Sequence, residues 1–376
     1  MSAVIFTEHA AENGKKIIQA TLNSPKSLNA LTLEMIRLLA PKLPEWQADD
    51  SVAAVILDGS GDKAFCAGGD IVNLYKGMTG ESVTGEANFC ETFFVEEYQL
   101  DHAIHCFSKP LIVWGGGIVM GGGLGLMAGA NYRVVTETSR IAMPEVSIGL
   151  YPDVGGSWFL NRMPGRVGLF LGLTAASMNA ADCRYVGLAD RFVQSDKRAL
   201  LLELLQAVAW GNGLGDLHHG VNTVLRQLEK DSLAALPCLQ PESQVLKHFD
   251  TINGLMDHYE LSDIVAGVLA LETEDRWLLR AQGALKAGSP AAMALIFSQI
   301  QRSRHLSLKQ VFQAELDLSV NCTTAGEFAE GVRALLIDKE GKPNWRFKSL
   351  AEVDGGWIEA LFESPWPADA HPLAAL

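Results

Sequence analysis

Apolar residues in the first half of the chain follow the spacing of strands and of helices by turns. Four short apolar segments bounded by turn residues have strand character: 17–22, 52–57, 111–114 and 132–136. Two longer segments, 31–46 and 86–107, have apolar residues at the spacing of amphipathic helices. Strands alternating with helices predict an α/β fold with parallel crossovers. Because a helix does not follow every strand, a purely doubly wound sheet is less well supported.

Helical periodicity takes over beyond about residue 196, where the strand signal fades. Three segments carry this pattern: 201–210, 223–236 and 293–301. We therefore expect two regions, an α/β core over residues 1–200 and a mainly helical region over residues 201–376 that covers the core.

One apolar run needs a separate interpretation. Residues 111–130, LIVWGGGIVMGGGLGLMAGA, contain no charged side chain and are long enough to span a bilayer. Eight of them are glycine, however, and each glycine costs a helix interior about 1 kcal/mol relative to alanine. We expect a short buried strand, a turn and the start of a helix here, and no membrane partner.

Composition narrows the classes of partner and compartment. The formal net charge of −14 argues against nucleic acid, because no basic surface remains to neutralise phosphates. The first residues, MSAVIFTEHAAENGKK, lack the pattern of a secretory signal and carry acidic residues, unlike a transit peptide. No CxxC pair occurs among the six cysteines, at positions 66, 90, 106, 183, 238 and 322, so reduced thiols are expected. These features predict a cytoplasmic protein.

Two glycine turns, each directly after a strand, bring bare backbone to the surface of the predicted core. They are CAGGD at 66–70 and MGGGLG at 120–125. Neither matches a P-loop or a dinucleotide fingerprint. The glycines are explained either by close packing of a helix on a strand or by two backbone N–H groups that bind one carbonyl oxygen, which is an oxyanion hole.

Two carboxylates lie in the turn-rich stretch MPEVSIGLYPDVGGSWFL at 143–160. Glu145 and Asp153 each follow a proline and have apolar neighbours, so partial burial should raise their pKa values towards those useful for acid–base chemistry. The alternative is that either residue caps a turn or a helix, and for Asp153, which precedes VGG, that alternative is about equally well supported.

A third carboxylate, Glu97, lies on the apolar face of the predicted helix 86–107. Phe93, Leu100 and Ile104 share that face, and a carboxylate among them should face a cavity or a buried ionic partner. Other candidates have less support. Cys66 lacks a histidine at a recognisable spacing, and the pair His102 and His105 lacks further ligands, so neither a thiol nucleophile nor a metal site is expected.

Together these motifs resemble the crotonase (enoyl-CoA hydratase/isomerase) superfamily. The resemblance rests on TLNSPKSLNALTLEM at 21–35, AFCAGGDI at 64–71, GGGIVMGGGLGL at 115–126 and AMPEVSIGLYPDVGGSWFL at 142–160. PDVGG, GSPAAMALI at 288–296 and EGVRALLIDKEGKPNW at 330–345 are most similar to the 3-hydroxyisobutyryl-CoA hydrolase branch, so the match extends nearly to the C-terminus.

The resemblance implies a fold and a set of roles. The fold is a spiral of ββα units followed by helices that cover the active site. By motif position, the N–H groups of Gly69 and Gly122 would bind the thioester oxygen. In the hydrolase branch, the residues matching Glu145 and Asp153 are implicated in catalysis, and those matching Glu97 and Gly122 bind substrate. The glutamate that hydratases carry in the GGGxE motif is replaced here by Gly125, which disfavours hydration by two glutamates.

The expected activity is therefore hydrolysis of a short-chain 3-hydroxyacyl-CoA, with 3-hydroxyisobutyryl-CoA the implied substrate, as in valine catabolism. No metal or other cofactor is required, since CoA is part of the substrate. Two alternatives stay open: an enoyl-CoA hydratase or isomerase, and a non-catalytic acyl-CoA binding protein. Members of the superfamily often form trimers, so a homo-oligomer is a further expectation.

Overall fold

The computed structural model describes residues 2–235, 241–367 and 369–376. The described chain forms two compact units, each assembled from three separate stretches. The first consists of Met1–Gly69, Leu100–Ile141 and Met178–Leu246; the second consists of Asp70–Gln99, Ala142–Ser177 and Lys247–Leu376. The division into a core and a helical region at residue 200 stays a prediction.

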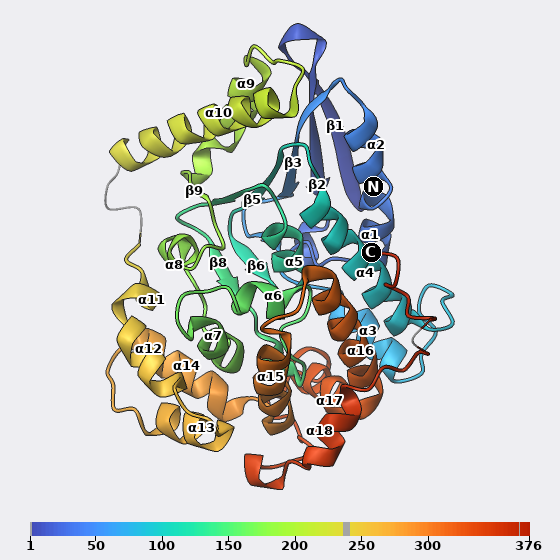
Figure 1. The fold of residues 1–376 in the computed structure, drawn as a ribbon, viewed down its shortest axis with the longest axis vertical. Helices are drawn as coiled ribbons and strands as arrows, with labels where there is room; N and C mark the ends of the chain where they lie inside the picture. The colour runs from blue at the N-terminus through green and yellow to red at the C-terminus, as the bar shows by residue number, and fades with distance from the viewer. Residues whose placement is uncertain (1, 236–240, 368) are drawn as a thin grey trace. The chain divides into compact units, whose positions relative to one another are not determined.

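The first unit is built on a six-stranded sheet with the order β1-β2-β3-β5-β7-β9 (Figure 1). Its strands are β1 (Val4–Ala10), β2 (Lys16–Leu22), β3 (Val52–Gly59), β5 (Leu111–Gly115), β7 (Tyr132–Val135) and β9 (Arg191–Phe192). β1 pairs antiparallel with β2, and every later pair is parallel. The predicted parallel crossovers are thus present. Strand β1 was not predicted, and most of its residues are exposed or half-buried.

A second, three-stranded sheet has the order β4-β6-β8 and consists of β4 (Ala64–Cys66), β6 (Ile118–Met120) and β8 (Arg140–Ala142). The pairs β3–β4, β5–β6 and β7–β8 each place their first strand in the larger sheet and their second in the smaller one. This repetition produces the ββα progression and explains why a helix does not follow every strand. Both glycine turns come directly after strands of the smaller sheet.

Helices cover both faces of the larger sheet, so β3 is buried at every position. On one face, Leu205 of α9 (Arg198–Gln206) and Val221 of α10 (Leu214–Ala235) belong to one buried cluster with Ile56 of β3. On the other face, side chains of α1 (Leu33–Leu39), α2 (Lys42–Ala48) and the end of α4 (Phe89–Cys106) surround a small apolar cavity together with β2, β3 and β5.

The expected elements are present, with one correction. The predicted single helix over 31–46 is two helices, α1 and α2, because Pro41 has no N–H to continue the hydrogen-bond ladder and begins a new helix instead. The apolar run 111–130 forms β5, β6 and α5 (Gly122–Ala128), as the glycine pattern predicts. Across the described residues, every helix is too short or too polar to cross a membrane.

The second unit is helical. Its helices include α3 (Ile71–Met78), α6 (Gly156–Leu160), α7 (Val167–Thr174), α12 (Phe249–Met256), α13 (Leu261–Ala270), α14 (Arg276–Ala287), α15 (Pro290–Ser303), α16 (Leu308–Ala325), α17 (Glu327–Val332) and α18 (Gly355–Leu361). α7 is apolar on all sides, and it contacts α12, α14 and α15. The helical segments expected beyond residue 196 are confirmed over 201–206, 223–235 and 293–301. Residues 207–210 lie beyond the end of α9 and are not helical, and Leu236 lies outside the described residues.

Two glycines of this unit provide a matched test of the helix packing. A Cβ on Gly168 of α7 would lie 2.0 Å from Leu160 O, whereas one on Gly283 of α14 meets nothing within 4 Å. Gly168→Ala should therefore lower the free energy of unfolding by about 1–3 kcal/mol. Gly283→Ala should raise it by about 0.5–1 kcal/mol, because alanine is the better helix former. Urea denaturation measures both, and equal effects from the two substitutions would contradict the packing described here.

Candidate active site

The sequence-predicted site residues fall into two groups. Gly69 and Gly122 lie in the first unit, and Glu97, Glu145 and Asp153 lie in the second. Of the three carboxylates, none is more than 5% exposed. Burial to this extent is costly for an ionised carboxylate unless hydrogen bonds or charges compensate it.

The two glycine turns of the first unit lie against each other. A Cβ on Gly123 would lie 2.2 Å from Cys66 O, and one on Gly68 would lie 3.5 Å from Met120 O. The strands that lead into the turns, β4 and β6, pair in parallel. Close packing of the turns therefore does require a glycine at 123, where a side chain would displace the backbone of the neighbouring turn.

Gly69 and Gly122 offer main-chain N–H groups in these turns. Gly122 is the first residue of α5, and the N–H groups of a first helical turn have no acceptor inside the helix. Gly121 before it has a φ of 47°, a conformation that favours glycine. Gly69 forms an isolated parallel bridge with Leu31. The packing explanation thus applies to Gly123, and the donor role of Gly69 and Gly122 stays a prediction.

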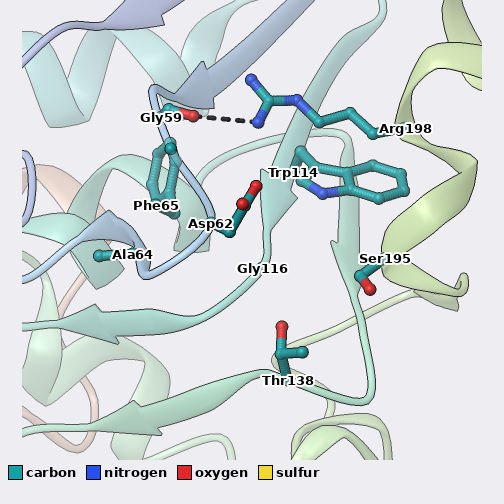
Figure 2. Close-up of a pocket in the computed structure, with 10 residues that line it drawn as sticks. Gly59, Asp62, Ala64, Phe65, Trp114, Gly116, Thr138, Ser195 and Arg198 are labelled. Carbon is teal, nitrogen blue, oxygen red and sulfur yellow. Dashed lines mark hydrogen bonds between the residues drawn. The ribbon is translucent and has the colours of Figure 1, made fainter. Parts of the chain in front are cut away.

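A small cavity of about 50 Å³ lies beside β4 in the first unit (Figure 2). Phe65, Trp114, Thr138 and Ser195 line it, together with Arg198. The guanidinium of Arg198 donates to Gly59 O at 3.0 Å, and it forms an ion pair with the buried Asp58. Its charge is therefore used within the protein, and we assign this cavity no role in binding.

Glu145 starts a short 3₁₀ turn, Glu145–Ile148, directly after Pro144. Its side chain is 4% exposed, and among the described residues its Oε2 atom has no hydrogen-bond partner. Burial, and then the nearby charge of Asp153, raises the pKa of Glu145 well above its usual value. A buried carboxyl group with an unsatisfied oxygen is suited to react with, or bind, a molecule that enters the site.

Asp153 lies in the tight loop PDVGG, where Val154 and Gly155 have φ values of 54° and 79°. Its backbone oxygen accepts a hydrogen bond from Gly156 N at 2.7 Å, so the backbone makes the turn into α6. The cap position of that helix is Gly155, and the N–H groups of Gly155 and Ser157 are bound by the carboxylate of Glu315, not by Asp153. The capping alternative is therefore wrong for its carboxylate, which is available for another interaction.

The Asp153 carboxylate lies at one end of a series of buried hydroxyl groups. The Tyr98 hydroxyl on α4 lies 2.7 Å from Asp153 Oδ2 and 2.7 Å from Ser319 Oγ on α16. Ser319 Oγ is 2.8 Å from the hydroxyl of Tyr151, which donates to Glu315 O at 2.7 Å. Burial raises the pKa of Asp153 to about 6, although the hydrogen bond from Tyr98 opposes that change.

Glu315 of α16 holds the PDVGG loop from the other side. Its carboxylate accepts hydrogen bonds from Gly155 N at 2.6 Å and Ser157 N at 2.9 Å, and from the Ser157 hydroxyl. These are N–H groups at the start of α6, so Glu315 supplies the cap that Asp153 does not. Burial raises the pKa of Glu315 to about 8, while the donors on Ser157 and Gly155 favour its ionised form.

Glu97 lies on α4 beside Tyr98, and it faces inward as predicted. It is 2% exposed, and Phe93, Leu100 and Ile104 on the same helix are equally buried. Glu97 is also one of the groups whose negative charge raises the pKa of Tyr98. The apolar face of the helix thus predicted the burial of Glu97 correctly. The role of Glu97 in binding substrate stays a prediction.

Four residues of this site were not predicted from the sequence: Tyr98, Tyr151, Glu315 and Ser319. One signal was available for two of them. Glu315 and Ser319 are one helical turn apart on the face of α16 that also buries Val311, Phe312 and Cys322. Polar residues on a buried stripe require partners, so the pattern marks α16 as a helix that meets other polar groups.

The remaining candidates are Cys66 and the pair His102 and His105. Cys66 is fully buried, and its Sγ lies 3.6 Å from Gly68 O inside the first glycine turn. Burial lowers the pKa of His105 to about 4. Within the described part of the chain, which excludes Cys238, no three His, Cys, Asp or Glu side chains are grouped so that they could hold a metal ion.

The chain is similar to known proteins in both sequence and structure. A model of the enoyl-CoA hydratase/isomerase family matches residues 17–362. A protein of Xenopus tropicalis named 3-hydroxyisobutyryl-CoA hydrolase, mitochondrial, is 37% identical over 368 residues, which cover 96% of this chain and 91% of the relative. The human protein of the same name is 36% identical, over 93% of this chain and 86% of its own length.

Two solved structures superpose over nearly the whole chain. An enoyl-CoA hydratase from Rhodobacter sphaeroides has a TM-score of 0.80 at 32% identity and covers 97% of this chain and 98% of its own. A carnitinyl-CoA dehydratase from Mycobacterium thermoresistibile has a TM-score of 0.84 at 32% identity, with coverages of 99% and 98%. The predicted fold class, a crotonase-like α/β spiral with a helical C-terminal region, is confirmed.

The predicted cytoplasmic location is contradicted by these comparisons. The curated relatives from frog, zebrafish and human all carry the word mitochondrial in their names. The prediction rested on the cysteine pattern and on the first residues of the chain. Free thiols indicate a reducing environment, and they do not distinguish one reducing compartment from another.

The raised pKa of Asp153 predicts how stability depends on pH. Because this pKa rises from 3.8 to about 6, the folded protein keeps a proton that the unfolded chain releases. Its contribution to the free energy of unfolding is therefore complete below about pH 4 and is lost as the pH rises to about 6, by at most about 1.4 kcal/mol per pH unit.

Asp153→Asn removes this contribution, so the decline in stability over that range should become shallower. Urea denaturation at a series of pH values measures the slope. The exposed Asp263 provides the control, since Asp263→Asn should keep the slope of the parent protein. Parallel curves for the Asp153→Asn variant and the parent would contradict the raised pKa.

Proposed function

The chain belongs to the enoyl-CoA hydratase/isomerase family, and from that premise we propose that it hydrolyses a short-chain 3-hydroxyacyl-CoA thioester, with 3-hydroxyisobutyryl-CoA as its substrate. The observation that carries the proposal is Glu145, a buried carboxyl group with an unpartnered oxygen, coupled to a second buried carboxyl group, Asp153. Curated relatives with the hydrolase name at 34–38% identity over most of the chain support the same activity.

The proposed reaction breaks the bond between the acyl carbon and the CoA sulfur. Glu145 acts either as the base that takes a proton from water or as the nucleophile that forms a mixed anhydride, which water then opens. In both routes the acyl carbon gains a hydroxyl oxygen from water, and the sulfur leaves as a thiol after it receives one proton. No metal or redox cofactor enters the reaction, because a thioester is already an activated acyl group.

Main-chain N–H groups would stabilise the charge that develops on the thioester oxygen. We assign this role to Gly69 and Gly122, whose turns carry no side chain that would hinder the carbonyl group. Each donor of an oxyanion hole is worth about 3 kcal/mol of transition-state stabilisation. Packing accounts for Gly123, and the assignment of Gly69 and Gly122 is supported by their motif positions and by the place of Gly122 at the start of α5.

The other carboxylates would orient the reactants. Asp153 lies on a loop fixed by Glu315. It would orient the water or the acyl hydroxyl and help to transfer the proton. Glu97 would accept a hydrogen bond from the 3-hydroxyl group of the acyl chain. This role suits a carboxylate that faces inward among apolar side chains. Without the carboxylate, those apolar side chains would favour an acyl group that lacks a hydroxyl.

Hydration of an enoyl-CoA is the second candidate. It is favoured by the two solved structures at 32% identity, whose titles name a hydratase and a dehydratase. It is disfavoured by Gly125, which occupies the position of one of the two glutamates that hydratases use. The two activities differ in their products, since only hydrolysis releases a free thiol. The homo-oligomer expected for the family stays a prediction.

A panel of acyl-CoA thioesters tests the proposed activity. Thiol release, followed with a disulfide reagent, should be fastest for 3-hydroxyisobutyryl-CoA, with 3-hydroxypropionyl-CoA as the nearest competitor. Loss of the enoyl absorbance without thiol release would establish hydration in its place.

Glu145→Gln tests the assigned carboxyl group. It should reduce thiol release by at least about a hundredfold, because an amide neither accepts the proton nor attacks the carbonyl. The denaturation midpoint of this variant separates chemistry from folding. An active, folded Glu145→Gln variant would exclude the proposed role.

Gly122→Pro tests the assigned donor. Proline is tolerated at the first position of a helix but has no N–H group. We expect a loss of about 10²–10³-fold in kcat with the circular dichroism spectrum retained. Gly125→Ala, within the same helix, is the control for a substitution that leaves every N–H in place. Equal activities of the two variants would argue against Gly122 as a donor.

A further inference from the structure

The hydroxyl groups around Asp153 form one continuous chain inside the second unit. It runs from Asp153 Oδ2 to Tyr98, Ser319 and Tyr151, and it ends at the backbone oxygen of Glu315, over four contacts of 2.7–2.8 Å. Tyr98, Tyr151 and Ser319 are fully buried. At these separations each contact is a hydrogen bond only if a hydrogen lies between its two oxygens.

The number of hydrogens in this chain depends on the state of Asp153. Tyr98, Ser319 and Tyr151 each carry one hydroxyl hydrogen, and the backbone oxygen of Glu315 only accepts. With Asp153 ionised, three hydrogens therefore serve four contacts, and one pair of buried oxygens lies in contact without a hydrogen. With Asp153 protonated, four hydrogens serve four contacts, all directed from Asp153 towards Glu315.

We infer that the chain Tyr98–Ser319–Tyr151 holds Asp153 as the protonated member of the Glu145–Asp153 pair. The three hydroxyl residues are positioning residues, since they act on the reaction only through Asp153. Glu145 has no corresponding series of hydroxyl groups. Its Oε2 atom has no hydrogen-bond partner among the described residues, so a proton carried there would have no acceptor. A proton shared by the pair is therefore better satisfied on Asp153, and Glu145 is left as the base or nucleophile.

The surroundings of Asp153 support this assignment. The titratable groups that act on it or respond to its charge come from each neighbouring element: Tyr98 on α4, Glu145 on the 3₁₀ turn, Tyr151 on the following loop, and Glu315 and Cys322 on α16. None of these groups is a cation. Burial raises the pKa values of both Glu145 and Asp153, so the pair retains a proton, and the hydrogen count places that proton on Asp153.

The inference deepens the proposed hydrolysis and rests on it for its role in the reaction. Protonated Asp153 gives its proton to the sulfur as the carbon–sulfur bond breaks, and the free thiol leaves. The hydroxyl of Tyr98 then turns towards the carboxylate, so the new anion receives a hydrogen bond as it forms. The chain ends at a carbonyl oxygen, so it reorients in place and does not conduct protons from solvent.

Removing a central hydroxyl should reverse the preference. In Ser319→Ala, Tyr98 donates to an ionised Asp153 and Tyr151 donates to Glu315 O, and no contact lacks a hydrogen. The pKa of Asp153 should therefore fall by about one unit, which is the tenfold change that one neutral hydrogen bond makes to an equilibrium. Infrared spectroscopy of the carboxylic acid band against pH, with Asp153→Asn subtracted in each background, measures this pKa without substrate.

Two further variants make the test decisive. Tyr151→Phe keeps the ring and removes the last hydroxyl of the chain, so it should lower the pKa of Asp153 in the same direction. Ser303→Ala removes another fully buried hydroxyl of this unit, one that donates to Gln299 O, and it should leave the titration unchanged. An unchanged or higher pKa in both Ser319→Ala and Tyr151→Phe would overturn the inference.

The same variants separate this inference from the proposed function. If the parent protein releases no thiol from any acyl-CoA, the proposed hydrolysis fails, while the infrared titration still decides the protonation of Asp153. If thiol release occurs, the acidic form of Asp153 should be required. The upper limb of the pH–kcat profile should then move to lower pH in Ser319→Ala by the shift seen in the infrared.

Discussion

The carboxylate of Glu315 fixes the loop on which the second unit's chemistry depends. It binds the N–H groups of Gly155 and Ser157 and so sets the conformation of the PDVGG turn. That turn contains Val154 at a positive φ, a conformation a β-branched residue adopts only when its surroundings impose it. Asp153 is held next to Tyr98 as a result. One residue of α16 thus positions an acid more than 150 positions earlier in the chain.

Local patterns predicted most of the strands and helices, because alternating and helical spacings are properties of short segments. The stripe on α4 placed Glu97 inside the protein for the same reason. The break at Pro41 was missed, since the apolar spacing continues across it and conceals the lost donor. β1 was missed because Val4 is its only buried residue, so the strand lacks an alternation of buried apolar and exposed polar residues.

The partners of Asp153 show where prediction from sequence ends. Tyr98, Tyr151 and Ser319 meet only after three distant segments have folded together, and of the three only Tyr151 lies within a motif that carries the family resemblance. The motif PDVGG marked the right loop, but it left open whether Asp153 caps a helix or acts on substrate. The structure decided against the cap because a different carboxylate performs that task. Compartment was beyond the sequence argument altogether, since free thiols suit several environments.

The interleaved construction of the two units has a consequence for synthesis on the ribosome. The apolar residues of β2 and β3 emerge first, while α9 and α10, which cover one face of the sheet they form, are the last parts of that unit to be translated. The apolar face of these strands is therefore exposed to solvent while the more than one hundred codons between β3 and α9 are translated. Nascent chains of this kind depend on chaperone capture, so expression yield should respond to chaperone supply more than to the stability of the finished protein.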